Sequence, residues 1–128
     1  MATMHVELVS IEAPIWSGEA TAIYARSLDG ELGVLPGHIP LIAALAPGFP
    51  VRVEQEGGDD LRVAVHGGFL SVTRDGVSVL AEQAELAQDI DVSRARDQLN
   101  RADPEKGPEE KAAHNRAMAR LRAAGEQV

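Results

Sequence analysis

Residues 30–41 read Gly30-Glu31-Leu32-Gly33-Val34-Leu35-Pro36-Gly37-His38-Ile39-Pro40-Leu41, and the rest of the chain is organised around them. Pro36 and Pro40 fix their φ angles and lack an N–H donor, so the stretch is neither a regular helix nor a long central strand. Its glycines allow backbone conformations that other residues avoid, which predicts sharp turns. Two interpretations stay open: a tight structural turn, or a surface loop that presents Glu31 and His38 to a partner.

The composition is typical of a globular protein with one main core. Of 128 residues, 45% are hydrophobic and only 3% aromatic, so Val, Leu, Ile and Ala must form that core. The absence of cysteine excludes disulfides, Cys-ligated zinc and thiol catalysis. No apolar run reaches the ~20 residues that span a bilayer, and the N-terminal residues lead us to expect no secretory signal. Any membrane association is therefore expected to go through a partner.

The net charge of −8 is unevenly distributed. Residues 1–87 contain four basic and twelve acidic side chains, whereas residues 88–128 contain eight of each. A nucleic-acid-binding protein is expected to show a basic face, so we expect no nucleic-acid partner. The asymmetry also indicates a chain built in two parts.

Residues 1–86 show the period-two pattern of β-strands, for example in Met4, Val6 and Leu8, which share one face. Turn or break signals lie at residues 13–18, 57–60, 67–68 and 75–76. Gly67-Gly68 is expected to mark a bulge, a corner or a close backbone approach. The pattern predicts a mainly β fold with a small α part, in which a β-sandwich of about ten short strands comes first.

Residues 87–128 show helical periodicity and are expected to form an antiparallel two-helix hairpin. Asp89 or Asp91 can cap the first helix, and a Pro-rich segment at residues 103–108 ends it. The apolar stripes are Val92, Ala95, Leu99 and Ala102 in the first helix, and Ala113, Ala117, Leu121 and Ala124 in the second. Alanine buries little area, so we expect a hairpin that docks on a surface and can leave it.

Catalytic and metal-binding motifs are missing from the sequence. The four histidines, His5, His38, His66 and His114, are scattered and lack metal-ligand spacing. There is no Gly-x-Ser-x-Gly elbow, and no Gly-Lys-Ser/Thr follows Gly67-Gly68. A β-sandwich enzyme therefore has no candidate set of residues, and we expect a protein that is not an enzyme.

Residues 30–41 strongly resemble the signature of the epsilon subunits of F-type ATP synthases, roughly Gly-Glu-Leu-Gly-x-x-Pro-Gly-His-x-Pro-Leu. The resemblance continues in order over most of the chain. Matching segments are Val6-Glu7-Leu8-Val9-Ser10, Ala46-Pro47-Gly48, Gly67-Gly68-Phe69-Leu70-Ser71-Val72, Val77-Ser78-Val79-Leu80-Ala81 and Gln88-Asp89-Ile90-Asp91-Val92-Ser93-Arg94-Ala95.

The resemblance implies a non-catalytic rotor subunit, peripheral at the cytoplasmic face of the bacterial cell membrane. Such a subunit sits at the foot of the central stalk, where it contacts the gamma subunit and the c-subunit ring through its sandwich, here residues 1–86. It helps to couple proton-driven ring rotation to ATP synthesis. The implied partner contacts are Glu31, toward a basic residue of the c-subunit loop, together with His38 and Ser10.

The resemblance also implies that the hairpin, residues 87–128, is regulatory. In this family it can inhibit ATP hydrolysis by extending along gamma into the catalytic alpha/beta hexamer. The short segment at residues 103–108 and a second helix that ends near residue 124 predict a shorter reach and weaker inhibition.

Some family members bind ATP as a regulatory ligand through an Ile/Leu-Asp-x-x-Arg-Ala motif, which residues 90–95 fit; no cofactor is required. The implied nucleotide-binding residues are Glu85, Ile90, Asp91, Arg94, Ala95, Arg101, Arg116 and Arg120. In the alternative interpretation, Asp91 only caps a helix and Arg94 is solvated. A different function also stays open: a stand-alone ATP-sensing protein that uses the hairpin arginines.

Overall fold

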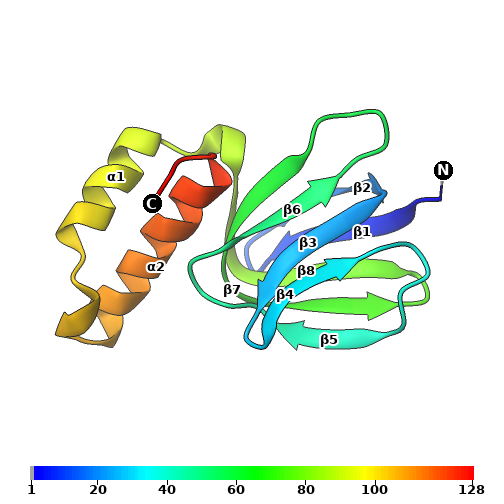
Figure 1. The fold of residues 1–128 in the computed structure, drawn as a ribbon, viewed down its shortest axis with the longest axis horizontal. Helices are drawn as coiled ribbons and strands as arrows, with labels where there is room; N and C mark the ends of the chain where they lie inside the picture. Colours follow the sequence, from blue (N-terminus) through cyan, green and yellow to red (C-terminus); the bar gives the residue numbers. More distant parts are fainter. Residues whose placement is uncertain (1) are drawn as a thin grey trace.

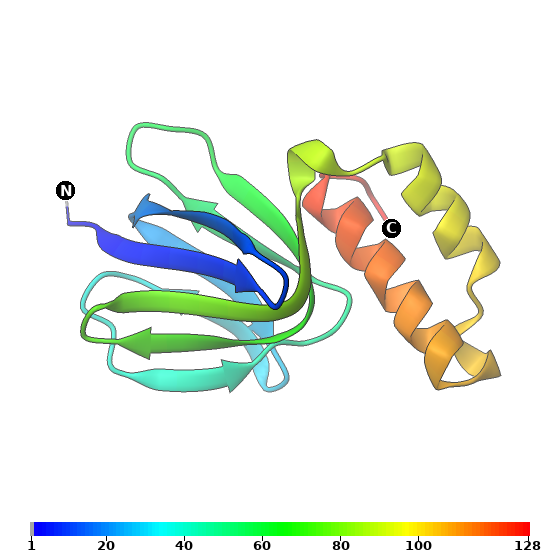
Figure 2. The same ribbon diagram turned by 180° about the vertical axis from the view of Figure 1, so that it is seen from behind.

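The computed structural model describes residues 2–128, and its strands form one sheet folded into a β-sandwich (Figures 1 and 2). The strand order is β2-β1-β8-β7-β6-β3-β4, and β5 also pairs with β7. Every pairing is antiparallel except that of β1 with β8. The strands are β1 (Met4–Ser10), β2 (Pro14–Ala20), β3 (Ala22–Ser27), β4 (Gly30–Val34), β5 (Leu41–Ala44), β6 (Pro50–Glu54), β7 (Leu61–Thr73) and β8 (Gly76–Leu86).

Strand β7 belongs to both layers of the sandwich. Its first half, Leu61–Ala64, pairs with β6, and its second half, Phe69–Val72, pairs with β5. Gly68 lies where β7 passes from one partner to the other, and a side chain there would collide with the backbone carbonyl of Leu80. Of the alternatives that the sequence left open at residues 67–68, a close backbone approach is therefore confirmed.

The predicted mainly β fold is confirmed, but the described residues contain eight strands rather than about ten. The main reason is that residues 67–68 do not interrupt β7. Residues 13–18 were also interpreted wrongly as a break, because β2 begins at Pro14. A proline is compatible with this place, since β2 is an edge strand and Pro14 is its first residue.

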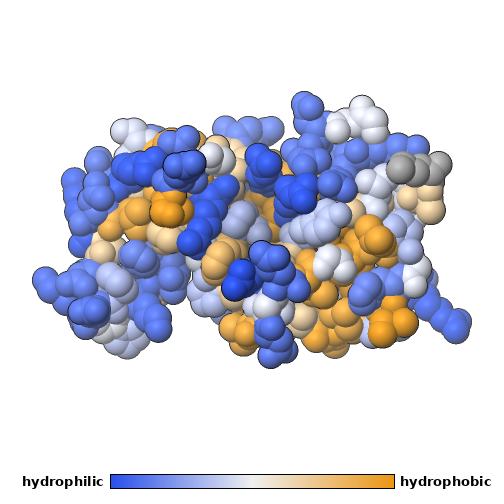
Figure 3. All heavy atoms as spheres, in the orientation of Figure 1, coloured by the Kyte–Doolittle hydropathy of each residue, from blue (hydrophilic) through white to orange (hydrophobic). Residues whose placement is uncertain are grey.

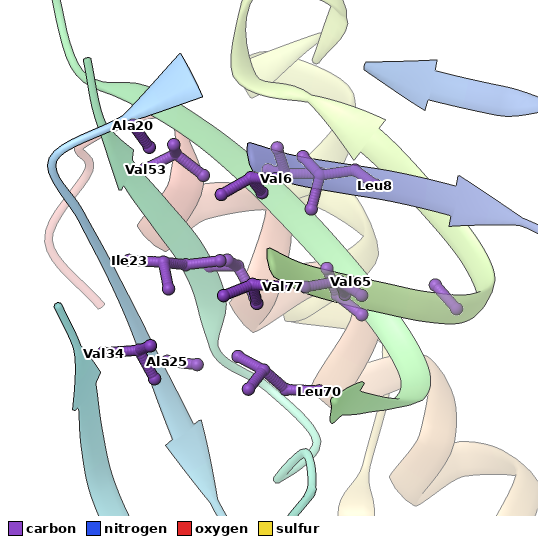
Figure 4. Packing of buried hydrophobic residues seen from close by; sticks show 14 of the residues in the cluster. Val6, Leu8, Ala20, Ile23, Ala25, Val34, Val53, Val65, Leu70 and Val77 are labelled. Atoms are coloured by element: carbon purple, nitrogen blue, oxygen red, sulfur yellow. The ribbon is translucent and has the colours of Figure 1, made fainter. Parts of the chain in front are cut away.

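Branched aliphatic side chains fill the space between the layers, as predicted from the scarcity of aromatic residues (Figure 4). No aromatic side chain is among the buried members of this core in the described chain, and Trp16 only packs against its edge. Within this core, the fully buried positions with the largest side chains are Leu8, Ile23, Leu70, Val6, Val34, Val51, Val53, Val63 and Val79.

After β8 come a 3-10 turn (Ala87–Asp89), α1 (Val92–Arg101), a second 3-10 turn (Pro104–Lys106) and α2 (Pro108–Ala123). The two helices form the predicted hairpin, and α2 lies between α1 and the sandwich (Figure 1). Neither helix is long and apolar enough to cross a membrane, nor is any other helix in residues 2–128.

Helix α2 is buried on more of its surface than the sequence pattern indicated. Ala117 and Leu121, from the predicted stripe, are fully buried. Ala119 and Ala123 lie outside that stripe but are also buried, and they pack on Ala64 of β7. The prediction missed this second face because alanine is too common along α2 to reveal a periodicity.

Candidate functional site

The organising stretch consists of a strand, a turn and an extended connection. Residues 30–34 form β4, and the carbonyl of Leu35 then accepts a hydrogen bond from the N–H of His38 at 3.1 Å. Pro36 and Gly37 occupy the two central positions, and the φ of +86° at Gly37 fits a type II turn. The glycine and proline pattern is thus explained by a structural turn, which joins β4 to β5 at the end of the sandwich away from the helices (Figure 1).

Strand β4 separates the two ionisable side chains of this stretch. Glu31 lies opposite Arg26 near the start of β4, its side chain is 86% exposed, and 3.6 Å separates the two charged groups. His38 follows the turn beyond the other end of β4, where its Nδ1 donates to the carbonyl of Ile39 at 2.6 Å. The two candidates therefore cannot belong to one small contact site, although each remains accessible at its own end of β4.

An exposed apolar face lies on the outside of the layer that contains β5, β7 and β8. Phe69 is paired with Leu80, and Ile42 lies on the neighbouring strand β5. Between 54% and 76% of each of these three residues is exposed, and hydrophobic side chains gather over β5 in the surface view (Figure 3). We call Ile42, Phe69 and Leu80 the apolar face. Contiguous apolar surface of this kind is typical of a protein interface.

The sequence did contain a signal for the apolar face. Phe69-Leu70 and Val79-Leu80-Ala81 are apolar at successive positions, and a strand with one buried face must point alternate side chains outward. Ser10, the third predicted contact, closes the β1–β2 turn, where its hydroxyl donates to the carbonyl of Ala13 at 3.0 Å. It lies next to Ile11, which is 80% exposed.

A second candidate site lies where the hairpin meets the sandwich. Arg120 of α2 donates through Nε to the Oε1 atom of Glu85 on β8 at 2.9 Å, and its Nη2 lies 2.8 Å from the same oxygen. Its Nη1 donates to Oε1 of Gln98 on α1 at 3.0 Å. Arg120 thus connects both helices to the sandwich, and we call Glu85, Gln98 and Arg120 the latch.

His66 of β7 adds a titratable group to the latch. Its Nε2 is buried without a hydrogen bond and lies 3.4 Å from Oε1 of Glu85. Burial and the neighbouring Arg120 charge lower the pKa of His66 below its ordinary value, which favours the neutral ring at pH 7. Burial by itself would raise the pKa of Glu85, but the hydrogen bond and charge of Arg120 outweigh it and lower that pKa. The latch is therefore built around an ionised carboxylate.

Five of the eight predicted nucleotide-binding residues line one cavity of about 240 Å³ beside the latch: Glu85, Asp91, Arg94, Ala95 and Arg120. Asp91 caps α1, because its carboxylate accepts a hydrogen bond from the N–H of Arg94 at 3.0 Å. The predicted capping role is confirmed. It does not exclude a ligand role, since Asp91 and Arg94 both border the cavity.

The other three predicted residues lie elsewhere. Arg101 and Arg116 line a neighbouring cavity of about 510 Å³, to which Arg120 also contributes. Ile90 packs against the cluster of Ala64, Ala119 and Ala123 instead of lining either cavity. Together the two cavities offer guanidinium groups that suit phosphate, but Arg120 is already held by the latch. Within residues 2–128, no group of three or more acidic or histidine side chains is arranged to hold a metal ion.

Comparison with known proteins gives a consistent result. Residues 3–87 match the family described as "ATP synthase, Delta/Epsilon chain, beta-sandwich domain". The ATP synthase epsilon chain of Mycobacterium avium is 50% identical over 125 residues, which cover 98% of each chain. The ATP synthase epsilon chain of Mycolicibacterium vanbaalenii is 51% identical over 126 residues, again with 98% coverage of both.

Solved structures resemble this fold as well. A chain in the OSCP/F1/c-ring structure of the Euglena gracilis mitochondrial ATP synthase superimposes with a TM-score of 0.78 at 28% identity. The match covers 98% of this chain and 83% of the other. A chain in the central stalk and c-ring structure of the Tetrahymena thermophila enzyme shares the fold, with a TM-score of 0.57 at 14% identity over 69% of each chain.

Proposed function

Since the chain belongs to the family of ATP synthase epsilon chains, we propose that it is a non-catalytic subunit of the central stalk. In this role it turns with the gamma subunit and the c-subunit ring and couples ring rotation to ATP synthesis. It associates with the cytoplasmic face of the cell membrane through these partners. The observation that carries the proposal is the 28% identical chain from an F1/c-ring complex, which matches 98% of this chain with a TM-score of 0.78.

The apolar face is the proposed contact with gamma. Ile42, Phe69 and Leu80 expose 76%, 54% and 54% of their surface, and burial of such side chains against a partner is favourable by roughly 1.5–3 kcal/mol each. Glu31, His38 and Ser10 are the proposed polar contacts, and Glu31 faces the c-subunit ring. An exposed ion pair contributes ~1 kcal/mol or less, so these residues should fix the relative position of the subunits more than they increase binding affinity.

The decisive experiment is co-purification of the chain with gamma and with the c ring. We expect both partners to be recovered, and Ile42→Asp to abolish gamma binding without changing the melting temperature. Leu28→Asp is the matched control, because Leu28 is also exposed but lies in the β3–β4 turn, outside the apolar face. Failure of the unaltered chain to bind either partner would overturn the proposed function.

Charge reversal at Glu31 tests the proposed ring contact. We expect Glu31→Arg to weaken coupling between proton flow and ATP synthesis in the assembled enzyme, while the free chain keeps its melting temperature. A variant that lowers only the melting temperature would instead assign Glu31 a structural role.

The hairpin is the proposed regulatory element. The structure describes it docked, and in the extended position it would reach the alpha/beta hexamer and inhibit ATP hydrolysis. We expect deletion of residues 88–128 to raise the ATPase activity of the assembled complex. Equal activity with and without these residues would remove the regulatory role but leave the stalk role intact.

A second candidate function, a stand-alone ATP sensor, is favoured by one observation: five candidate nucleotide-binding residues line one cavity. Titration of the isolated chain with MgATP, followed by NMR chemical shifts, tests it. A saturable shift at Arg94 and Ala95 supports ATP as a regulatory ligand, and no response at millimolar MgATP excludes it.

A further inference from the structure

Four arginines gather in a groove between the sandwich and the end of α2, on a different side of the hairpin from the latch. They are Arg26 of β3, Arg52 of β6, Arg62 of β7 and Arg122 of α2. The groove has a volume of about 860 Å³. Residues 1–87 contain only one further basic side chain, Arg74, so this acidic part of the chain concentrates its positive charge at one place. We call this site the arginine groove.

Aromatic rings hold three of the guanidinium groups in position. The guanidinium carbons of Arg26 and Arg122 lie 5.0 and 4.3 Å from the ring centre of Phe49. Arg52 lies 4.4 Å from the ring centre of Tyr24 in the same way. Cation–π contacts orient these side chains without neutralising their charge. The stacked arginines also occupy the rings, so the rings are poorly placed to receive a nucleotide base.

The positive charges in the arginine groove are only partly compensated. Arg52 is neutralised by Glu54 at 3.0 Å and Asp60 at 2.8 Å. Arg122, in contrast, donates to the carbonyl of Gly48 at 2.6 Å and has no carboxylate partner among residues 2–128. Arg62 has neither a hydrogen bond nor an ion pair with any described residue.

Of the carboxylates that border the groove, Glu126 is engaged by Arg96 at 2.9 Å, and Glu31 reaches only Arg26, across 3.6 Å. The described structure therefore leaves Arg62 and Arg122 without a carboxylate partner.

Part of the positive charge in the arginine groove is left uncompensated. Arg62 is directly opposite Arg52 on the neighbouring strand, and the carboxylates of Glu54 and Asp60 offset the charge of Arg52 but make no ion pair with Arg62. Burial and the neighbouring Arg26 charge lower the pKa of Arg122, which is a further sign of uncompensated charge. A bound anion would compensate the charges of Arg62 and Arg122.

We propose that the arginine groove binds a phosphate-bearing anion of the polyphosphate class between α2 and the sandwich. Guanidinium groups that converge from separate elements can share the oxygens of one tetrahedral anion. The groove, of about 860 Å³, has room for a compact anion, and the carboxylates of Glu31 and Glu126 at its border would repel an acidic peptide that extended beyond it. Because Tyr24 and Phe49 are already stacked, the site recognises phosphate and not a base.

This site is separate from the cavity beside Asp91 and Arg94. Arg120 and Arg122 are two residues apart, which on an α-helix separates their directions by roughly 200°. The arginine groove contains residues of both the sandwich and α2, so an anion bound there favours the docked hairpin by linkage. The inference goes beyond the proposed stalk function and does not depend on it.

The test uses the full chain, labelled for NMR, in a buffer without phosphate or sulfate. Inorganic pyrophosphate is added at constant ionic strength. We expect saturable shifts at the Phe49 and Tyr24 rings and at the Nε–H groups of Arg62 and Arg122, together with slower amide exchange in α2.

Arg62→Gln is the informative variant, because Arg62 is exposed and has no partner whose loss would unfold the chain. It should weaken pyrophosphate binding by about tenfold, the effect of one charge-assisted hydrogen bond. Arg74→Gln is the matched control, since Arg74 lies outside the groove, and it should bind like the unaltered chain.

Three results would overturn the proposal: no saturable shift at millimolar pyrophosphate, shifts confined to the Asp91 and Arg94 cavity, or equal weakening by Arg62→Gln and Arg74→Gln. A second titration, with ATP and followed at the Phe49 ring, tests whether the ligand is a free polyphosphate or a nucleotide. Affinities of ATP and pyrophosphate that agree within about threefold support phosphate recognition, and ATP bound tenfold more tightly contradicts it.

Discussion

The core of the sandwich and the surface where α2 packs on β7, which we call the seat of the hairpin, are stabilised by different interactions. In the core, fully buried Val, Leu and Ile side chains from both layers interlock. At the seat, the buried contacts are three alanines, Ala64, Ala119 and Ala123, supported by the polar latch. Alanine buries little apolar area, so most of the specificity at the seat must come from polar contacts: Arg120 with its two partners, and Arg122 with the carbonyl of Gly48.

The difference shows how one chain can combine a rigid part with a detachable one. Burial of large aliphatic groups is strong and non-directional, and it changes little with pH or salt. A small apolar seat secured by charged hydrogen bonds is weaker, and it responds to pH and ligands. Damage to the core should therefore unfold the protein, whereas damage to the seat should release only the hairpin.

The largest effect should come from the core. Leu70→Ala removes a fully buried side chain and should lower the free energy of unfolding by about 2–5 kcal/mol. Urea denaturation followed by circular dichroism measures this loss. Leu28→Ala, at a position that is 68% exposed, is the control and should change stability little. Loss of helical structure alone in Leu70→Ala would contradict the distinction between the two regions.

The next largest effect should come from the latch. Arg120→Ala leaves the half-buried Glu85 and Gln98 without their donor and should weaken docking by about 1.5–3 kcal/mol. Amide exchange should accelerate in α2 but stay slow in β7. Arg101→Ala, which removes an exposed arginine of α1, should have no such effect in the absence of nucleotide.

Acidification should release the hairpin through the same residues. The pKa of His66 is depressed below its ordinary 6.5, so docking is fully favoured above that pH and weakens as the pH falls below it. The pKa of Glu85 is also depressed, so its contribution is present above about 4.5 and is lost at lower pH. NMR chemical shifts of α2, recorded as a function of pH, measure the release. His66→Gln should remove the part of the release that takes place between about pH 6.5 and pH 4.5.

Overpacking of the seat should have a smaller effect. Ala119→Leu inserts a larger side chain against Ala64 and should weaken docking by about 1–3 kcal/mol. The same substitution at the exposed Ala112 of α2 should stay within about 0.5 kcal/mol. Equal effects of the two variants would mean that α2 does not seat through Ala119.

The smallest effect should be local to α1. Asp91→Ala removes the cap of α1 and should cost about 1 kcal/mol of helix stability, while α2 remains docked. Asp91→Ser retains a capping hydroxyl and should restore the helix. If ATP binding is lost in both variants although the helix is intact in Asp91→Ser, the carboxylate has a ligand role as well.

The fold could be predicted because the sequence patterns that determine it depend on interactions between residues that are close together along the chain. The alternation at Met4, Val6 and Leu8, the hairpin signalled by Asp75-Gly76 and the cap at Asp91 each depend on residues close in sequence, although the two loop residues of that hairpin are Arg74 and Asp75. Gly67-Gly68 was harder to interpret, because a glycine pair fits a break as well as the crowded passage of a continuous strand. Only the pairing of β7 with both β6 and β5 decides between them.

The candidate sites depended on contacts that no local pattern contains. Glu85 and Arg120 are 35 residues apart, and their pairing follows from how α2 lies on β7 and β8. The resemblance placed Arg120 among phosphate ligands, and the structure additionally shows its intramolecular partners. The arginine groove was not predicted at all, since its members come from four separate elements that only the fold brings together.

The continuity of β7 has a consequence for how this protein can tolerate change. Ala64, in the seat of the hairpin, and Phe69, on the apolar face, are five residues apart on this one strand. A single-residue insertion between them would turn every later side chain of β7 to the opposite face, so that Leu70 would point outward and Phe69 inward. The face that β7 turns to the core already changes once between these positions, since Val63 and Val65 point inward before Gly67, and Leu70 and Val72 point inward after it. The number of residues across the glycine pair therefore sets both surfaces at once, and length variation there is expected to be selected against even where individual side chains vary freely.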